Sequence, residues 1–203
     1  QLKGPLPWFR TQWCKPRAQM KHGSYANAIG LELAVRIIDP ATQYVFVMHN
    51  DVLVCHSHWL QFMFSKMNNL LRGVAASQDR IRVRAMHVSG ILFDFNLYKM
   101  LNMSFLPNIP VYDVGDLITL RLRDAGYNYY ICRNTFNNLE TIDRIPVNNK
   151  LHDMYCDRVF DDNDNVIYLH LGRGTPKAEG RCNHIGKTYP EEWINYAEKH
   201  LLV

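Results

Sequence analysis

An uninterrupted apolar run at residues 44–48 limits what this chain can fold into. Its β-branched and aromatic side chains favour a strand, and the lack of polar alternation is typical of a central strand covered on both faces. The polar residues His49, Asn50 and Asp51 follow at once, and another apolar segment begins at Val52. The sequence therefore predicts a buried strand that ends in a polar turn.

Helical patterns flank this strand on both sides. Before it, apolar residues recur at three- and four-residue spacing, Ser24 stands where an N-cap is expected, and Pro40 ends the pattern. After it, Ser57 and Gly73 bracket a second helical pattern. The strand is therefore expected to lie between two helices.

The same reading extends to the rest of the chain. We expect helices at residues 25–38, 58–71, 97–101, 117–125 and 190–201, with weaker helical signals at residues 148–158. Strands are expected at residues 44–48, 73–76, 81–86, 127–132 and 166–170, and a strand or a loop at residues 89–95. Because helices and strands alternate, we predict a single α/β domain whose sheet is mostly parallel and flanked by helices.

The composition excludes several classes of protein. The chain has 203 residues, the size of one domain, and its 47% hydrophobic and 21% charged residues distinguish it from disordered proteins. The net charge of +4 is mild and no basic run is present, so nucleic-acid binding is not expected. No apolar stretch is long enough to span a membrane, and five cysteines without a CxxC pair favour reduced thiols in a cytoplasmic protein.

The polar turn after the apolar strand is a candidate site. Ligands of α/β sheets bind outside the carboxyl ends of the strands, which is where His49 and Asp51 stand. An imidazole and a carboxylate two residues apart can both reach one divalent cation. A turn in which the side chains of Asn50 and Asp51 bond to their own backbone fits the spacing equally well.

A resemblance to the family-two glycosyltransferases of the GT-A fold favours the ligand site. Residues 21–28 begin a helix that leads to the strand and to Asp51, and Trp59 and Leu60 follow. This order resembles the family's helix start, its hydrophobic strand ending in Asp-x-Asp, and its next helix. Asp51 falls on the last Asp of that motif and His49 on the first. The resemblance implies a divalent cation, Mn²⁺ or Mg²⁺, that bridges the phosphates of a nucleotide-sugar donor at these residues.

Residues 112–126 resemble a second motif of the family, in which carboxylates open a helix with a later Arg-Leu pair and a glycine. In inverting members one of these carboxylates is the general base that deprotonates the acceptor hydroxyl. The resemblance implies Asp113 or Asp116 in that role. Asp113, at the junction of loop and helix, is the preferred candidate.

Residues 166–175 resemble a third stretch of the family, a strand that ends in His before a Gly-rich turn. His170 is therefore implied to contact the diphosphate or to complete the metal shell. Arg173 in the same turn could pair with a phosphate through two hydrogen bonds. His87 and Ser89 occupy the place of an acceptor-side or sugar-contacting segment.

The resemblance spans residues 21–175, after an irregular lead-in at residues 1–20 and before a C-terminal loop and helix at residues 176–203. It implies an inverting glycosyltransferase that moves a sugar from a nucleotide-sugar to a hydroxyl of a glycan or another acceptor. The family's opening nucleoside-binding unit is not visible in residues 1–20, so either it lies upstream of Gln1 or the fold is reduced. The alternative is a non-catalytic glycosyltransferase-like module that binds carbohydrate or protein.

Overall fold

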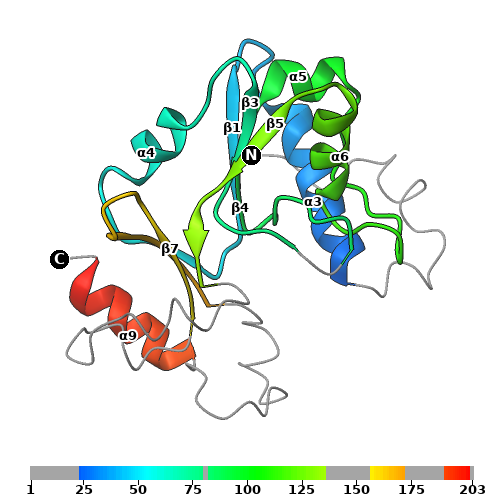
Figure 1. Ribbon diagram of the computed structural model, residues 1–203. Helices are drawn as coiled ribbons and strands as arrows, with labels where there is room; N and C mark the ends of the chain where they lie inside the picture. Colours follow the sequence, from blue (N-terminus) through cyan, green and yellow to red (C-terminus); the bar gives the residue numbers. More distant parts are fainter. Residues whose placement is uncertain (1–22, 80–81, 136–155, 172–189, 202–203) are drawn as a thin grey trace.

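The computed structural model describes residues 23–79, 82–135, 156–171 and 190–201, which form a mixed α/β fold (Figure 1). Within these residues, five helices accompany two sheets of four strands each. The helices are α3 (Gly23–Ile37), α4 (Trp59–Ser65), α5 (Phe95–Met100), α6 (Asp116–Asp124) and α9 (Pro190–His200). The first sheet consists, in spatial order, of β1 (Tyr44–Met48), β4 (Gly90–Asp94), β3 (Leu71–Ala75) and β5 (Asn128–Ile131). The second consists of β2 (Val52–Val54), β8 (Val166–His170), β7 (Asp157–Phe160) and β6 (Arg133–Asn134).

Helices cover both faces of the first sheet. The helices α3, α5 and α6 lie on one side of it and α4 lies on the other (Figure 1). On the first side, Ala28 of α3 and Ile118 of α6 pack with Phe93 of β4. On the second side, Met63 of α4 packs with Leu92 of β4 in a cluster that also holds residues of the second sheet. The side chains of β4 thus alternate between two cores, as the period of a strand requires.

Two sequence-based expectations concern these helices. The helices expected at residues 25–38, 97–101, 117–125 and 190–201 are confirmed as α3, α5, α6 and α9, with ends shifted by at most two residues. None of the helices in the described part of the chain combines the length and the apolar character that crossing a membrane requires. Cys55, Cys132 and Cys156 are free thiols.

The prediction of a mostly parallel sheet is wrong. In the first sheet β4 runs antiparallel to both β1 and β3, and only β3 and β5 pair in parallel. In the second sheet every pair of neighbouring strands is antiparallel. An apolar run reports that a strand is covered on both faces, and β4 shows that such a strand can also be antiparallel.

The strand at residues 44–48 is confirmed, but its predicted central position is wrong. In the described residues β1 is the edge strand of its sheet and pairs only with β4, and only Val47 is buried. Its two aromatic side chains pack against helix α4, on the face of the sheet that this helix covers. The Phe46 ring contacts Trp59 edge-on at 4.8 Å between centroids, and Tyr44 contacts Phe64 at 5.2 Å.

The helix predicted at residues 58–71 is too long. α4 ends at Ser65, because the side chain of Asn68 accepts hydrogen bonds from the backbone N–H groups of Leu70 and Leu71 and turns the chain into β3. The cap residue is His58 rather than Ser57, and its side chain makes no capping hydrogen bond.

Three further expectations are corrected. Ser24 lies inside α3 rather than capping it. Residues 82–86 of the strand expected at 81–86 are not a strand, since Arg84 adopts a φ of 52° and Met86 forms only an isolated bridge with Gln78. Of the helical signals at residues 148–158, only 156–158 are described, and Asp157 begins strand β7. The other predicted strands correspond to β3, β4, β5 and β8.

Two glycines provide a stability test of this packing. A Cβ atom at Gly90 of β4 would lie 2.6 Å from Oη of Tyr168 and 2.9 Å from Cβ of Ala76, so Gly90→Ala is expected to lower the free energy of unfolding by about 2 kcal/mol. Gly30 in α3 has no neighbouring atom within 4 Å of such a Cβ, so Gly30→Ala is expected to raise it by roughly 0.5–1 kcal/mol. Urea denaturation measures both changes. A Gly90→Ala variant as stable as the wild type would contradict this description of the core.

Candidate functional site

The turn between β1 and β2 carries Asp51 to the end of β8. β2 pairs with β8 so that Val52 lies opposite His170. The backbone N–H of Leu171 donates to the carbonyl oxygen of Asp51 at 2.9 Å, which fixes the turn against the end of β8. Residues more than a hundred positions apart in sequence therefore meet at one point.

His49, Asp51 and His170, called here the His–Asp–His group, could hold a metal ion. One ligand atom from each residue lies within 4.8 Å of the other two. Oδ1 of Asp51 lies 3.4 Å from Nε2 of His170 and 3.9 Å from Nδ1 of His49. All three residues were singled out from the sequence, and the structure brings them together.

The donor atoms of this group suit some cations better than others. Two imidazoles and one carboxylate are typical ligands of Mn²⁺, Zn²⁺ and similar transition metals, whereas Mg²⁺ prefers oxygen ligands and retains several waters. The expected Mn²⁺ therefore fits the residues present, and the expected Mg²⁺ fits them less well.

Asp157 is a member of the site that the sequence did not reveal. Its Oδ2 lies 3.6 Å from Nδ1 of His170, on the side of the ring opposite Asp51. The sequence alone predicts only a solvated turn for Asp157 and the nearby Asp161, Asp162 and Asp164. Its role depends on the antiparallel pairing of β7 with β8, which places it directly across from His170. The residues next to Asp157 in the sequence do not indicate that pairing.

The two carboxylates determine the charge of His170. Burial alone would lower the pKa of this histidine, which is 6% exposed, but Asp157 and Asp51 raise it to about 9. Burial likewise opposes ionisation of Asp51, yet contact with His170 and His49 holds the pKa of Asp51 below its usual value. Without a metal, the site therefore carries an imidazolium between two carboxylates at neutral pH.

The other two histidines near the site are uncharged. Burial, followed by the charge of His170, lowers the pKa of His49, whose Nε2 lies 3.5 Å from Nδ2 of Asn27. Burial and the charges of His170 and His49 lower the pKa of His87 to about 4. The ring centroids of the three histidines form a triangle with sides of 5.7, 5.8 and 6.0 Å.

Ser89 fixes the orientation of the His87 ring. Nδ1 of His87 lies 2.8 Å from Oγ of Ser89 and accepts from the backbone N–H of Ser89 at 3.3 Å. Because a backbone N–H can only donate, these contacts favour the tautomer with its proton on Nε2. Ser89 is 1% exposed. It therefore supports His87, and its predicted contact with a sugar hydroxyl would require it to give up this buried position.

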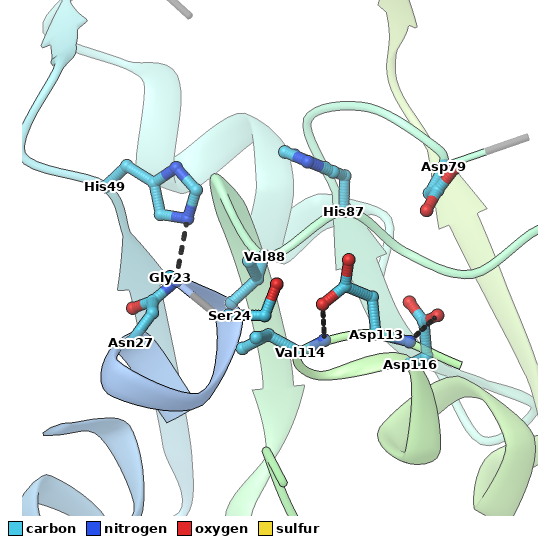
Figure 2. Close-up of a pocket in the computed structure, with 10 residues that line it drawn as sticks. All are labelled: Gly23, Ser24, Asn27, His49, Asp79, His87, Val88, Asp113, Val114 and Asp116. Atoms are coloured by element: carbon cyan, nitrogen blue, oxygen red, sulfur yellow. Dashed lines mark hydrogen bonds between the residues drawn. The ribbon is translucent and has the colours of Figure 1, made fainter. Parts of the chain in front are cut away.

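A cavity of about 200 Å³ opens beside His49. On one side stand His49 and the first residues of α3, and on the other stand three carboxylates (Figure 2). The described residues that line it are Gly23, Ser24, Asn27, His49, Asp79, His87, Val88, Asp113, Val114 and Asp116. The predicted residues His87, Asp113 and Asp116 thus share a cavity with His49.

The two aspartates predicted as bases differ in their surroundings. Oδ2 of Asp113 pairs with Arg82 at 3.1 Å, and its Oδ1 accepts from the N–H of Val114 at 2.8 Å. Oδ2 of Asp116 accepts from the N–H of Asp113 at 2.7 Å, and burial, together with the charges of Asp79 and Asp113, raises the pKa of Asp116 to about 6. Asp116 is therefore a buried carboxylate whose pKa lies near neutrality. Arg173, the remaining predicted residue, lies outside the described residues.

The charge of His170 predicts a pH-dependent stability. Its pKa is raised from 6.5 to about 9 in the folded chain, so its ion pairs stabilise the fold fully below pH 6.5 and this contribution is lost as the pH rises through about 9. The stability difference between wild type and His170→Gln should therefore shrink by up to about 3 kcal/mol between about pH 6 and about pH 10. Urea denaturation with a chelator present measures it. His58→Gln, at an exposed histidine, is the control, and a constant difference for His170→Gln would contradict the ion pairs.

The contact between Asp157 and His170 predicts an effect on metal affinity. We expect Mn²⁺ to bind the wild type and Asp157→Asn to weaken that binding by about tenfold or more, because a carboxylate behind a ligating histidine orients the ring and strengthens the ligand. Isothermal titration calorimetry with Mn²⁺ measures the change. Asp162→Asn, at an exposed carboxylate paired with Lys66, is the matched control. Equal affinities for the two variants would remove Asp157 from the site.

Comparison with known proteins does not assign this chain to a family. Neither a scan against protein-family models nor a search of curated proteins found a match for this chain.

Proposed function

We propose that this protein is a glycosyltransferase that transfers a sugar from a nucleotide-sugar donor to an acceptor hydroxyl. The observation that carries the proposal is the position of His49. This residue belongs both to the His–Asp–His group and to the lining of the cavity that holds Asp116. A group suited to a cation and a diphosphate therefore adjoins a buried carboxylate whose pKa is near neutrality, as transfer to a hydroxyl requires.

The donor end of the site would be the His–Asp–His group. The diphosphate would lie at His49, Asp51 and His170, where a bound Mn²⁺ would supply positive charge to the departing diphosphate. When no metal is bound, His170 can instead donate a charged hydrogen bond to a phosphate oxygen while Asp157 holds its other nitrogen. The order of these residues along the chain, which resembles family-two glycosyltransferases, supports this assignment.

The acceptor end would be the cavity, with Asp116 as the general base. The acceptor oxygen attacks the anomeric carbon, the bond from that carbon to the diphosphate oxygen breaks, and the hydroxyl proton moves to Asp116. Asp116 is preferred over Asp113 for a physical reason. Both oxygens of Asp113 are already engaged, Oδ2 by Arg82 and Oδ1 by the N–H of Val114, whereas Asp116 has a hydrogen bond to Oδ2 alone. A single displacement of this kind inverts the anomeric centre.

Two substitutions test the proposal at its two ends. Asp116→Asn removes the proton acceptor and should lower kcat by about 100-fold or more while donor binding persists. Asp51→Asn should weaken donor binding itself. Transfer and donor hydrolysis are measured with a panel of nucleotide-sugars and Mn²⁺, and donor binding is measured by thermal shift.

Asp124→Asn is the matched control, because Asp124 lies on the same helix as Asp116 and is exposed. Transfer that survives both Asp116→Asn and Asp51→Asn would overturn the mechanism. Sugar binding without transfer from any donor would instead favour the non-catalytic module.

A further inference from the structure

The cavity beside His49 is lined by negatively charged residues, although it adjoins the proposed diphosphate site. Three of the residues that line it are aspartates, and none of its described lining residues is a lysine or an arginine. The His–Asp–His group, the proposed diphosphate site, shares only His49 with this lining. The cavity beside the proposed donor end is therefore lined by negative charge.

The carboxylates of the cavity are fixed in place. Arg82 bridges Asp79 and Asp113, at 3.4 Å and 3.1 Å from their Oδ2 atoms. Figure 2 shows Asp79, Asp113 and Asp116 on the same side of the cavity, with the carboxyl group of Asp113 pointing towards His87. This single guanidinium offsets one of the three negative charges when all three aspartates are ionised.

Asp116 presents one acceptor atom to the cavity. Its side chain is 2% exposed, and Oδ2 is held by the N–H of Asp113. Among the described residues Oδ1 has no hydrogen-bond partner and is not sealed from solvent, so it opens into the cavity that Asp116 lines. A carboxylate oxygen in this position accepts a hydrogen bond from the molecule that occupies the cavity. A hydroxyl or an ammonium can donate there, whereas a second carboxylate or a phosphate cannot.

We propose that this cavity binds the acceptor as a sugar ring without negative charge and rejects sugars that carry a carboxylate or a phosphate. The role of the bound sugar as acceptor rests on the proposed function, whereas the charge preference rests on the cavity alone. Sugar hydroxyls donate to the oxygens of Asp79, Asp113 and Asp116, and the Nε2–H of His87 donates to a ring or hydroxyl oxygen. The three carboxylates of the lining would also keep the donor's diphosphate out of the acceptor cavity.

Two valines make the cavity observable without knowledge of the natural acceptor. Val88 and Val114 line it, and their methyl groups report occupation by NMR in protein labelled with ¹³C at valine methyls. The probes are glucose, glucosamine, glucuronate and glucose 6-phosphate, which share one ring and differ in charge. We expect the Val88 and Val114 signals to shift with glucose and glucosamine, and the two anionic sugars to bind at least tenfold more weakly.

A charge-neutralising variant tests the cause of that preference. Asp79→Asn should narrow the gap between glucose and glucuronate by about tenfold, because one repulsive charge is lost. Asp124→Asn, exposed on α6, should leave the gap as it is in the wild type. Glucuronate or glucose 6-phosphate binding as tightly as glucose would overturn the proposal, and so would valine signals that move with none of the four sugars.

The same data separate this inference from the proposed function. If glucose binds the cavity selectively while no nucleotide-sugar supports transfer, the charge preference stands and the glycosyltransferase assignment fails. If transfer occurs and the preferred acceptor is anionic, the assignment stands and the inference fails.

Discussion

The antiparallel pairing of β2 with β8 is the interaction on which the candidate site depends. It aligns Val52 with His170 and thereby brings Asp51 within 3.4 Å of that histidine. On its other edge β8 pairs with β7, which supplies Asp157 in the same register. A shift of one residue in either pair would turn these side chains to the opposite face of the sheet. Backbone register, rather than any local motif, brings Asp51, His170 and Asp157 together.

The sequence predicted most of the elements but not how the strands combine. An uninterrupted apolar run identified β1, and helical spacing and end signals identified α3, α6 and α9, because burial leaves a local record in the order of apolar residues. The direction and order of strands leave no such record. The antiparallel β4 and the edge position of β1 were therefore missed, although both strands were located nearly to the residue.

The same distinction explains which site residues could be predicted. His49 and Asp51 follow an apolar strand, and His170 ends another, so each was visible from its own neighbours. Asp157 was not, because only its partner across the sheet gives it a role. The choice between Asp113 and Asp116 also required the fold, since it depends on Arg82 and on the burial of Asp116.

The hydroxyl of Tyr168 fixes the position of His170 relative to His87. It donates to the carbonyl oxygen of Ser89, which joins β8 in the second sheet to the residue that orients His87 beside the first. The aromatic ring itself is buried in the cluster shared by both sheets. One core side chain thus acts as a spacer between the sheet that presents His170 and the loop that presents His87. The distance between His170 and His87 is then set inside the hydrophobic core, where solvent and bound molecules do not reach the contact.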